Sequence, residues 1–366
     1  MEYKRLGDYI REVNVRNRDE KVTKPMGINI DKHFMPSVAN VIGTDLSAYK
    51  LVSKNQFACN LMHVGRDEKI PMAMQTDDNP IIVSPAYFVF EISQTEVLLP
   101  EYLMMWFSRP EFDRNAWFYT DADVRGGMDK SAFMDMMLPI PSIERQREIV
   151  EEYETLSRRI SLNEQMIQKL EATAQALYRK MFIDGIDKEN LPDGWRMGTL
   201  GEVAKIVTGK LNSEDAVDNG KYPFFTCSQE TYKTDTYAFD QEAVILAGNN
   251  ASAIYPLKVF KGKFNAYQRT YVISSTCYTV CNKQIFFAIK DKLEDFKGVS
   301  QGTTTKFLTI KILNEIPIII SDVNSHMEFS TQEEALYNNI FLINQENSKL
   351  KELQSLLLAK MGNIKQ

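Results

Sequence analysis

Residues 149–181, IVEEYETLSRRISLNEQMIQKLEATAQALYRKM, decide the fold of this chain. Their apolar side chains recur at alternating spacings of four and three residues, which is the heptad pattern of a helix that packs along another helix. We therefore expect a long amphipathic helix with a helical partner. Its seam comprises Ile149, Tyr153, Leu156, Ile160, Asn163, Ile167, Leu170, Ala174, Leu177 and Met181.

The same pattern returns about 180 residues later, which indicates an internal repeat. The dipeptide Lys169-Leu170 matches Lys349-Leu350 in the same register. A repeat of this kind predicts internal two-fold symmetry, which is useful to a protein that binds duplex DNA because the duplex is itself roughly two-fold. We expect Asn163 and Asn347 to fix the register of the helix pair. The second seam comprises Phe329, Glu333, Leu336, Ile340, Ile343, Asn347, Leu350, Gln354, Leu357 and Met361.

The segments that precede the two helices share their edges but not their interiors. Leu6-Gly7-Asp8 matches Leu200-Gly201-Glu202, and Leu138-Pro139-Ile140 matches Ile316-Pro317-Ile318. Two recognition domains for different targets would show this pattern, and so would an old duplication that drifted without a functional split. The chain is thus divided into a first domain (1–141), a first spacer helix with linker (142–190), a second domain (191–322) and a second spacer helix (323–366).

Length and composition agree with this division. A chain of 366 residues with 44% hydrophobic and 11% aromatic residues can build two cores. No apolar run approaches the roughly 18 residues of a membrane span, and no signal-peptide segment follows Met1. We expect a cytoplasmic protein.

The cysteines and histidines predict no metal site. Four cysteines show no disulfide spacing, and three histidines are too few to favour structural zinc. Cys277 and Cys281 lie in an apolar run, residues 271–289, that we expect to form buried strands.

The net charge of the chain argues against DNA binding, but the distribution of the charges weakens that argument. The net charge is −6, yet residues 191–320 carry 15 basic against 13 acidic side chains. An acidic chain that binds DNA needs a narrow basic groove, or a basic partner subunit, to contact the phosphates. Basic runs such as those of both domains are more often solvated surfaces than binding sites.

Catalytic motifs do not stand out. No phosphate-binding glycine loop, nucleophile with its base, or metal cluster is recognisable, which favours a binding protein over an enzyme. Two alternatives stay open: a methylase or nuclease with unrecognised motifs, and a coiled-coil adaptor that binds only other proteins.

Three stretches carry a family resemblance that covers essentially the whole chain. They are Leu191-Pro192-Asp193-Gly194-Trp195 before Leu200-Gly201-Glu202-Val203, then Pro139-Ile140-Pro141 before Glu144-Arg145-Gln146, and Lys263-Phe264-Asn265-Ala266-Tyr267-Gln268-Arg269. In order, they resemble three parts of the specificity subunits of Type I restriction-modification systems: the start of a target-recognition domain, the domain-to-helix junction, and the core strand that enters a DNA-facing loop. The second junction, residues 316–322, lacks the Glu-x-Gln pattern of the first, so its helix is expected to begin differently.

The repeat and the resemblance together imply an α+β fold. Two mixed α/β target-recognition domains are separated by two long antiparallel helices that form a coiled coil. Each domain would read one half of a bipartite DNA site, while the helices set the gap and dock two modification subunits. The resemblance places S-adenosylmethionine on those subunits, and ATP with Mg²⁺ on a separate motor-nuclease subunit. This chain itself is expected to hold no cofactor.

Candidate DNA-binding residues are polar side chains expected on loops, because Arg, Lys, Asn and Gln read base edges. Asn249-Asn250 could instead be a plain turn. Exposed helix residues such as Arg158, Arg159 and Gln165 are candidates for the modification-subunit interface. The DNA-binding candidates are His63, Arg66, Lys69 and Arg125 in the first domain, and Gln229, Lys233, Asn249, Asn250, Lys263, Gln268, Arg269, Gln301 and Thr303 in the second.

Overall fold

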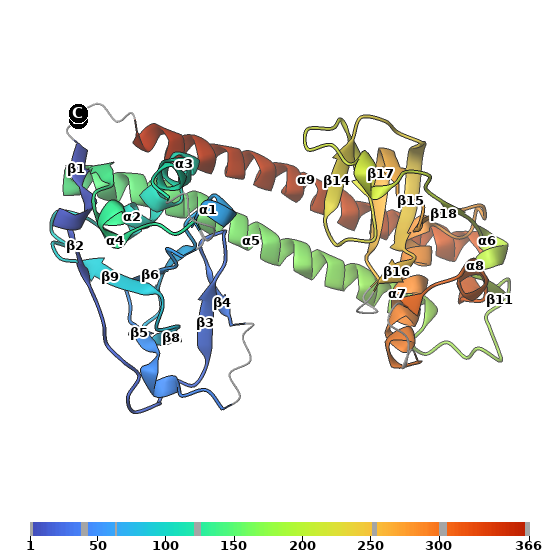
Figure 1. Ribbon diagram of the computed structural model, residues 1–366. Helices are drawn as coiled ribbons and strands as arrows, with labels where there is room; N and C mark the ends of the chain where they lie inside the picture. Colours follow the sequence, from blue (N-terminus) through green and yellow to red (C-terminus); the bar gives the residue numbers. More distant parts are fainter. Residues whose placement is uncertain are drawn as a thin grey trace. The chain divides into compact units, whose positions relative to one another are not determined.

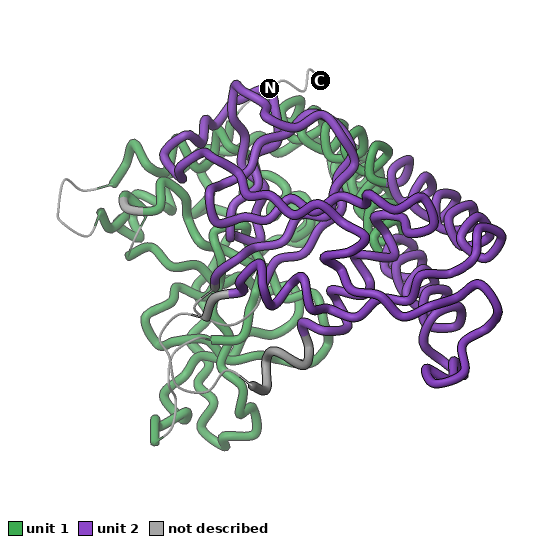
Figure 2. Tube along the Cα trace, turned by 90° about the vertical axis from the view of Figure 1, so that its right-hand side faces the viewer, with its two compact units in different colours: residues 1–164, 344–366 green, residues 165–343 purple. Residues whose placement is uncertain are grey.

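The computed structural model describes residues 3–37, 43–62, 64–120, 126–250, 255–299 and 306–362. Two compact units are distinguished in Figure 2: unit 1 comprises residues 1–164 and 344–366, and unit 2 comprises residues 165–343. Two long helices, α5 (Ile143–Phe182) and α9 (Val323–Met361), contribute to both units (Figure 1). The expected mixed α/β chain with two long helices is confirmed.

Unit 1 is built on small antiparallel and mixed sheets. Its described strands form two four-stranded sheets, in the orders β2-β9-β6-β7 and β4-β3-β8-β5, and the pair β1-β10. The strands are β1 Tyr3–Arg5, β2 Ile10–Glu12, β3 Pro25–Ile28, β4 Phe34–Pro36, β5 Lys50–Val52, β6 Phe57–Cys59, β7 Met72–Met74, β8 Ile81–Val83, β9 Phe88–Ile92 and β10 Met137–Pro139, and the helices are α1 Val64–Asp67, α2 Pro100–Phe107, α3 Pro110–Phe118 and α4 Lys130–Met134.

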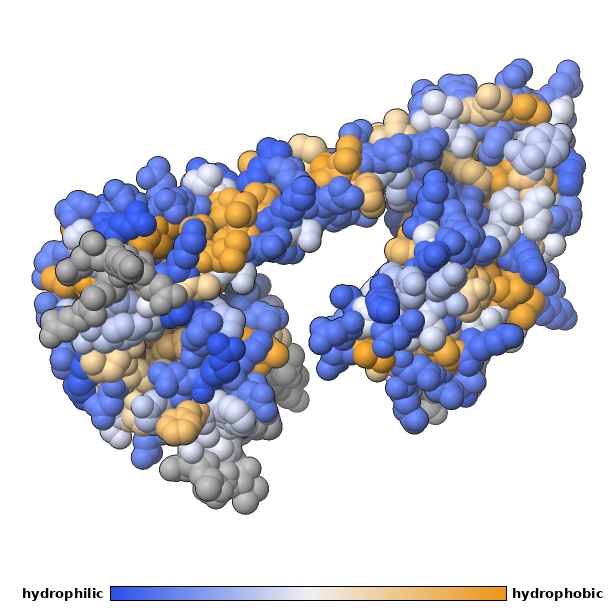
Figure 3. Space-filling view, turned by 90° about the horizontal axis from the view of Figure 1, so that it is seen from above, coloured by the Kyte–Doolittle hydropathy of each residue, from blue (hydrophilic) through white to orange (hydrophobic). Residues whose placement is uncertain are grey.

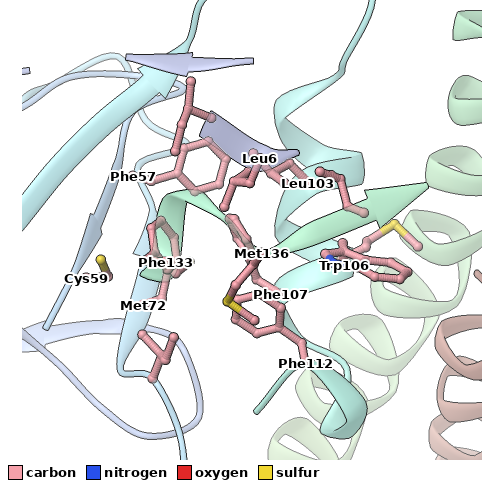
Figure 4. Packing of buried hydrophobic residues seen from close by; sticks show 14 of the residues in the cluster. Leu6, Phe57, Cys59, Met72, Leu103, Trp106, Phe107, Phe112, Phe133 and Met136 are labelled. Carbon is pink, nitrogen blue, oxygen red and sulfur yellow. The ribbon is translucent and has the colours of Figure 1, made fainter. Parts of the chain in front are cut away.

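Strand β9 separates two cores of unit 1. Phe88 and Phe90 pack with helices in the larger cluster, whereas Val89 points into the smaller one, as the two-residue period of a strand requires. Phe90 stacks on Phe57 with ring centroids 5.0 Å apart. Figure 4 shows the labelled Phe57 and Phe133 among the other apolar side chains of the larger cluster. Burying each such ring stabilises the fold by about 1.5–3 kcal/mol.

Unit 2 contains a larger sheet, in the order β12-β18-β15-β17-β13-β14. Ala243 and Ile245 of β15 lie in one apolar cluster, while Val244 and Leu246 pack in the cluster that includes α7. The strands are β11 Arg196–Thr199, β12 Ala204–Thr208, β13 Tyr222–Phe225, β14 Thr231–Thr234, β15 Phe239–Ala247, β16 Asn249–Asn250, β17 Leu257–Ala266, β18 Thr270–Ser275, β19 Lys306–Phe307 and β20 Pro317–Ile320, and the helices are α6 Leu200–Val203, α7 Asn282–Val299 and α8 Ile310–Asn314.

One element differs from the sequence expectation. Strand β18 ends at Ser275, and residues 282–289 belong to helix α7 rather than to a second buried strand. Ile285, Ala288 and Ile289 are buried at helical spacing on α7. The prediction was wrong because a short apolar run does not distinguish a buried strand from a buried helix. Cys281 is a free thiol beside this helix, and burial raises its pKa to about 11.

The two units frame their domains in the same way. The backbone N–H of Leu6 donates to the Met136 carbonyl at 2.8 Å, and that of Leu200 donates to the Ile316 carbonyl at 2.8 Å. Strand β1 pairs antiparallel with β10, and β11 pairs antiparallel with β20, in each case directly before a long helix. The recurring Leu-Gly-acid sequence therefore occupies equivalent positions in the two halves.

The long helices contact each other within each unit. In unit 1, Asn163 donates to Asn347 at 2.8 Å and Gln354 donates to Ser157 at 2.7 Å. Rising numbers in α5 meet falling numbers in α9, so these segments run in opposite directions. In unit 2, the ring of Phe182 meets that of Phe329 at 5.1 Å. All the seam residues expected from the sequence are buried or half-buried.

No helix in the described parts of the chain has both the length and the apolarity needed to cross a membrane.

Candidate DNA interface

The turn between β17 and β18 is the best-defined candidate surface in unit 2. The Tyr267 N–H donates to the Phe225 carbonyl at 2.9 Å, and the Gln268 N–H donates to the Leu211 carbonyl at 3.0 Å. The Arg269 carbonyl accepts from the Gly248 N–H at 2.8 Å. Main-chain bonds thus join this turn to three other segments, while the side chains of Gln268 and Arg269 are exposed.

Two glycines permit this close approach of backbones. A Cβ atom at Gly209 would lie 1.8 Å from the Ala266 carbonyl oxygen, and one at Gly248 would lie 2.6 Å from that of Arg269. Both distances are far shorter than any van der Waals contact. A side chain at either position would therefore separate the turn from its supporting segments.

The predicted residue Gln229 lies in the exposed loop after β13, beside the same turn. Lys258 holds this loop, because its ammonium group donates to the Gln229 carbonyl at 2.6 Å and to Thr231 Oγ1 at 2.9 Å. The Cys227 thiol donates to the Arg269 carbonyl at 3.5 Å. Partial burial lowers the pKa of Lys258. The sequence showed Lys258 only as part of a basic run and did not indicate its supporting role.

The other candidates of unit 2 lie on strands. Lys233 is exposed on β14, and Lys263 is exposed on β17 with its ammonium group 4.7 Å from the centre of the Tyr237 ring. Asn249 and Asn250 form β16, which pairs with β19, so the plain-turn alternative is wrong. The predicted candidates Gln301 and Thr303 lie outside the described residues.

The candidates of unit 1 fall in two segments that the backbone holds together. The Gly65 N–H donates to the Gly126 carbonyl at 2.7 Å, and the Met128 N–H donates to the Leu61 carbonyl at 2.8 Å. His63 and Arg125 lie outside the described residues, next to these bonded positions.

Arg66 and Lys69 belong to the first of those two segments. The expectation that Arg66 lies on a loop was wrong, because it belongs to the short helix α1. Lys69 follows that helix and is exposed in part.

A buried ion pair supports this segment of unit 1. The Lys32 ammonium group lies 2.7 Å from Asp113 Oδ1 and donates to the Ile70 carbonyl at 3.1 Å. The same carboxylate oxygen accepts from the Ile70 N–H at 3.2 Å. Burial lowers the pKa of Lys32, against the opposing effect of Asp113. No sequence pattern indicated this pair, because its members are far apart along the chain.

The geometry suits recognition of a polar ligand. Exposed amide and guanidinium groups on supported turns can donate hydrogen bonds to base edges or phosphates. Among the described residues, no group of three His, Cys, Asp or Glu side chains is placed to hold a metal ion.

Comparison with known proteins decides between the open readings. Residues 192–356 match the family model described as the Type I restriction modification DNA specificity domain. A segment of 130 residues is 34% identical to the EcoDI specificity subunit of Escherichia coli and covers 36% of this chain. Over these matched residues the chain is similar to Type I specificity subunits. The resemblance stated from the sequence is confirmed.

Other relatives of this family extend the match. The chain is 22% identical over 278 residues, 65% of its length, to the MjaIX specificity subunit of Methanocaldococcus jannaschii. The matched segments span 28% of the EcoDI subunit and 64% of the MjaIX subunit. A crystal structure of the Type I S subunit from M. genitalium is similar in fold, with a TM-score of 0.55 and 12% identity over 98% of this chain and 95% of that one.

Proposed function

We propose that this chain is the sequence-specific DNA-binding subunit of a Type I restriction-modification complex. Each globular domain reads one half of a bipartite site. The match of residues 192–356 to the DNA specificity domain carries the proposal. The exposed Gln268 and Arg269 on their supported turn supply side chains of the kind that read bases in the major groove.

The architecture proposed for this role is a pseudo-two-fold molecule in four parts, residues 1–141, 142–190, 191–322 and 323–366. Two observations support it: the equivalent hydrogen bonds of Leu6 and Leu200, and the strand pair that precedes each long helix. The helices form an antiparallel coiled coil, supported by the contact of Asn163 with Asn347. A rigid helix pair sets the spacing between the half-sites.

The chain is proposed to be non-catalytic and to act through partners. Two modification subunits, which bind S-adenosylmethionine, dock on the helices, and motor-nuclease subunits supply ATP- and Mg²⁺-dependent cleavage. Leu162, Leu353 and Leu356 are exposed apolar residues on the helices of unit 1. Figure 3 shows apolar patches among the polar side chains of the helices. Arg159, a candidate for this interface, is already paired with Glu346 at 2.9 Å. The complex is proposed to act in the cytoplasm.

A domain exchange tests the proposal. The chain is assembled with its modification subunits, given S-adenosylmethionine and a randomised DNA library, and the methylated sequences are read. Replacing residues 191–322 by the corresponding domain of another specificity subunit should change one half-site and leave the other intact. An adaptor that binds only proteins would give no sequence preference before or after the exchange.

The proposed helix spacer has a separate test. A four-residue insertion in the helix pair should alter the gap between half-sites without altering either half-site. An unchanged gap would contradict the spacer role while leaving the recognition role in place.

A further inference from the structure

A cavity of about 880 Å³ lies in unit 2, and none of the described DNA-binding candidates lines it. Its wall is formed by residues of strands β15, β17 and β18, of the loop that precedes α7 and the start of that helix, and of α9. This volume is sufficient for a small organic group. The residues that the argument uses are Glu242, Phe260, Tyr278, Lys283, Glu333 and Tyr337.

Glu333 is the unusual member of this lining. Its side chain is 1% exposed, and neither carboxylate oxygen has a hydrogen-bond partner among the described residues. The nearest cation is the Lys283 ammonium group at 3.9 Å, which is too far for a hydrogen bond. A buried carboxylate without donors costs free energy, so a group that donates to it gains more than it would at the surface.

Aromatic rings complete the lining. The Lys283 ammonium group lies over the face of Tyr337, which shows that this ring accepts a cation. Phe260 and Tyr278 also line the cavity, and Tyr278 is 81% exposed. Phe260 is half-buried, and aromatic rings beside a buried carboxylate are the surroundings that a flat organic cation prefers.

The charges of the lining have the sign that attracts a cation. Three carboxylates, Glu242, Glu333 and Glu334, face two ammonium groups, Lys261 and Lys283. Burial raises the pKa of Glu333 to about 7, while Lys283 opposes and Glu242 reinforces that rise. Burial also lowers the pKa of Lys283. The lining thus carries one more acidic than basic side chain.

We propose that this cavity binds an alkylguanidinium group, with its planar N–H donors on the Glu333 carboxylate and its faces against the aromatic side chains. A guanidinium suits the site better than an ammonium, because it presents paired donors in one plane and stacks on rings. Two kinds of molecule could supply this guanidinium group: a free small guanidine, or a partner protein through an arginine side chain.

Calorimetric titration of the full chain with N-propylguanidine tests the binding. The neutral isostere N-propylurea serves as the ligand control. The cation should bind with one-to-one stoichiometry and the urea at least tenfold more weakly. Because the ionised Glu333 is the binding form, affinity should rise as pH increases through about 7, and binding near that pH should release protons.

Two substitutions distinguish binding at this site from nonspecific electrostatic attraction to the protein. Glu333→Gln should weaken N-propylguanidine binding at least tenfold and abolish the proton release. Glu328→Gln makes the same change at an exposed position of α9 that does not line the cavity, and should leave binding unchanged. Thermal unfolding of both variants establishes that they remain folded.

Assembly with the modification subunits distinguishes the two sources. If a partner's arginine fills the cavity, Glu333→Gln weakens assembly and N-propylguanidine competes with it. If the ligand is a free molecule, assembly is unaffected while ligand binding is lost. Failure of N-propylguanidine to bind, or equal binding to wild type and Glu333→Gln, would overturn the proposal and leave the DNA-recognition role standing.

Discussion

The two globular domains share a frame and differ in how they hold their candidate recognition residues. In unit 2, main-chain hydrogen bonds join the turn of Gln268 and Arg269 to neighbouring segments. In unit 1, main-chain bonds likewise join the two candidate segments, and the buried pair of Lys32 and Asp113 additionally holds Ile70, which follows the first of them. The frame bonds of Leu6 and Leu200 are nevertheless the same. The frame is therefore shared, while the supports of the candidate surfaces differ.

The largest effect is expected from breaking the side-chain anchor of unit 1. Asp113→Ala leaves Lys32 charged and unpaired at a position where its side chain is 7% exposed. Removing one partner of a buried ion pair typically costs about 3–5 kcal/mol. Denaturant unfolding should show this loss, and methylation should lose sequence preference at the half-site of unit 1 only.

Two variants control that experiment. The double substitution Lys32→Met and Asp113→Leu removes both charges and should recover much of the stability. Asp78→Ala breaks the exposed pair with Lys54 and should leave unfolding unchanged. Equal unfolding of Asp113→Ala and wild type would refute the anchoring role of the pair.

A change on the recognition turn of unit 2 should have the next largest effect. Arg269→Ala removes an exposed guanidinium while the main-chain bonds of the turn remain. Loss of one good base contact is worth about 1–3 kcal/mol, or roughly 10–100-fold in affinity. Competition binding by the assembled complex should show this loss for the unit 2 half-site. Arg196→Ala, at an exposed arginine of β11 paired with Glu202, is the matched control and should bind normally.

The smallest expected effect concerns the starts of the two long helices. Ser142 accepts from the Arg145 N–H at the start of α5, whereas Asp322 accepts from the N–H groups of Asn324 and Ser325 at the start of α9. Hydrogen bonds from Ser325 and Trp195 help to lower the pKa of Asp322 to about 2 from 3.8.

Because the pKa of Asp322 is lowered in the folded state, the protein should lose stability as the pH falls. The stabilisation by ionised Asp322 is complete above about 3.8 and is lost as pH falls towards 2. Asp322→Ser makes this start resemble that of α5, so its unfolding should depend less on pH in that window. Urea unfolding of both proteins between pH 5 and pH 2 measures the difference. Parallel pH profiles would show that Asp322 contributes nothing through its charge.

The sequence predicted the elements whose signal is local. The heptad spacing of residues 149–181 indicated α5 and its seam, because amphipathic periodicity depends only on neighbours along the chain. Helix α7 was missed because its apolar residues 285–289 form a short run that does not distinguish a buried helix from a buried strand.

The supports of the candidate surfaces could not be predicted in the same way. Lys258 meets Gln229, and Lys32 meets Asp113, only after the chain has folded. The sequence showed Lys258 and Lys32 only as members of basic runs, and such runs carry no information about the partners of each side chain. Which loop residues contact bases is still a prediction.

The most direct test of the central claim is methylation-sensitive long-read sequencing of DNA from cells with and without this gene. A bipartite methyladenine motif should be present with the gene and absent without it, and Arg269→Ala should reduce methylation of that motif. An unchanged methylome in cells that express the cognate modification subunits would contradict the specificity role and favour a protein adaptor.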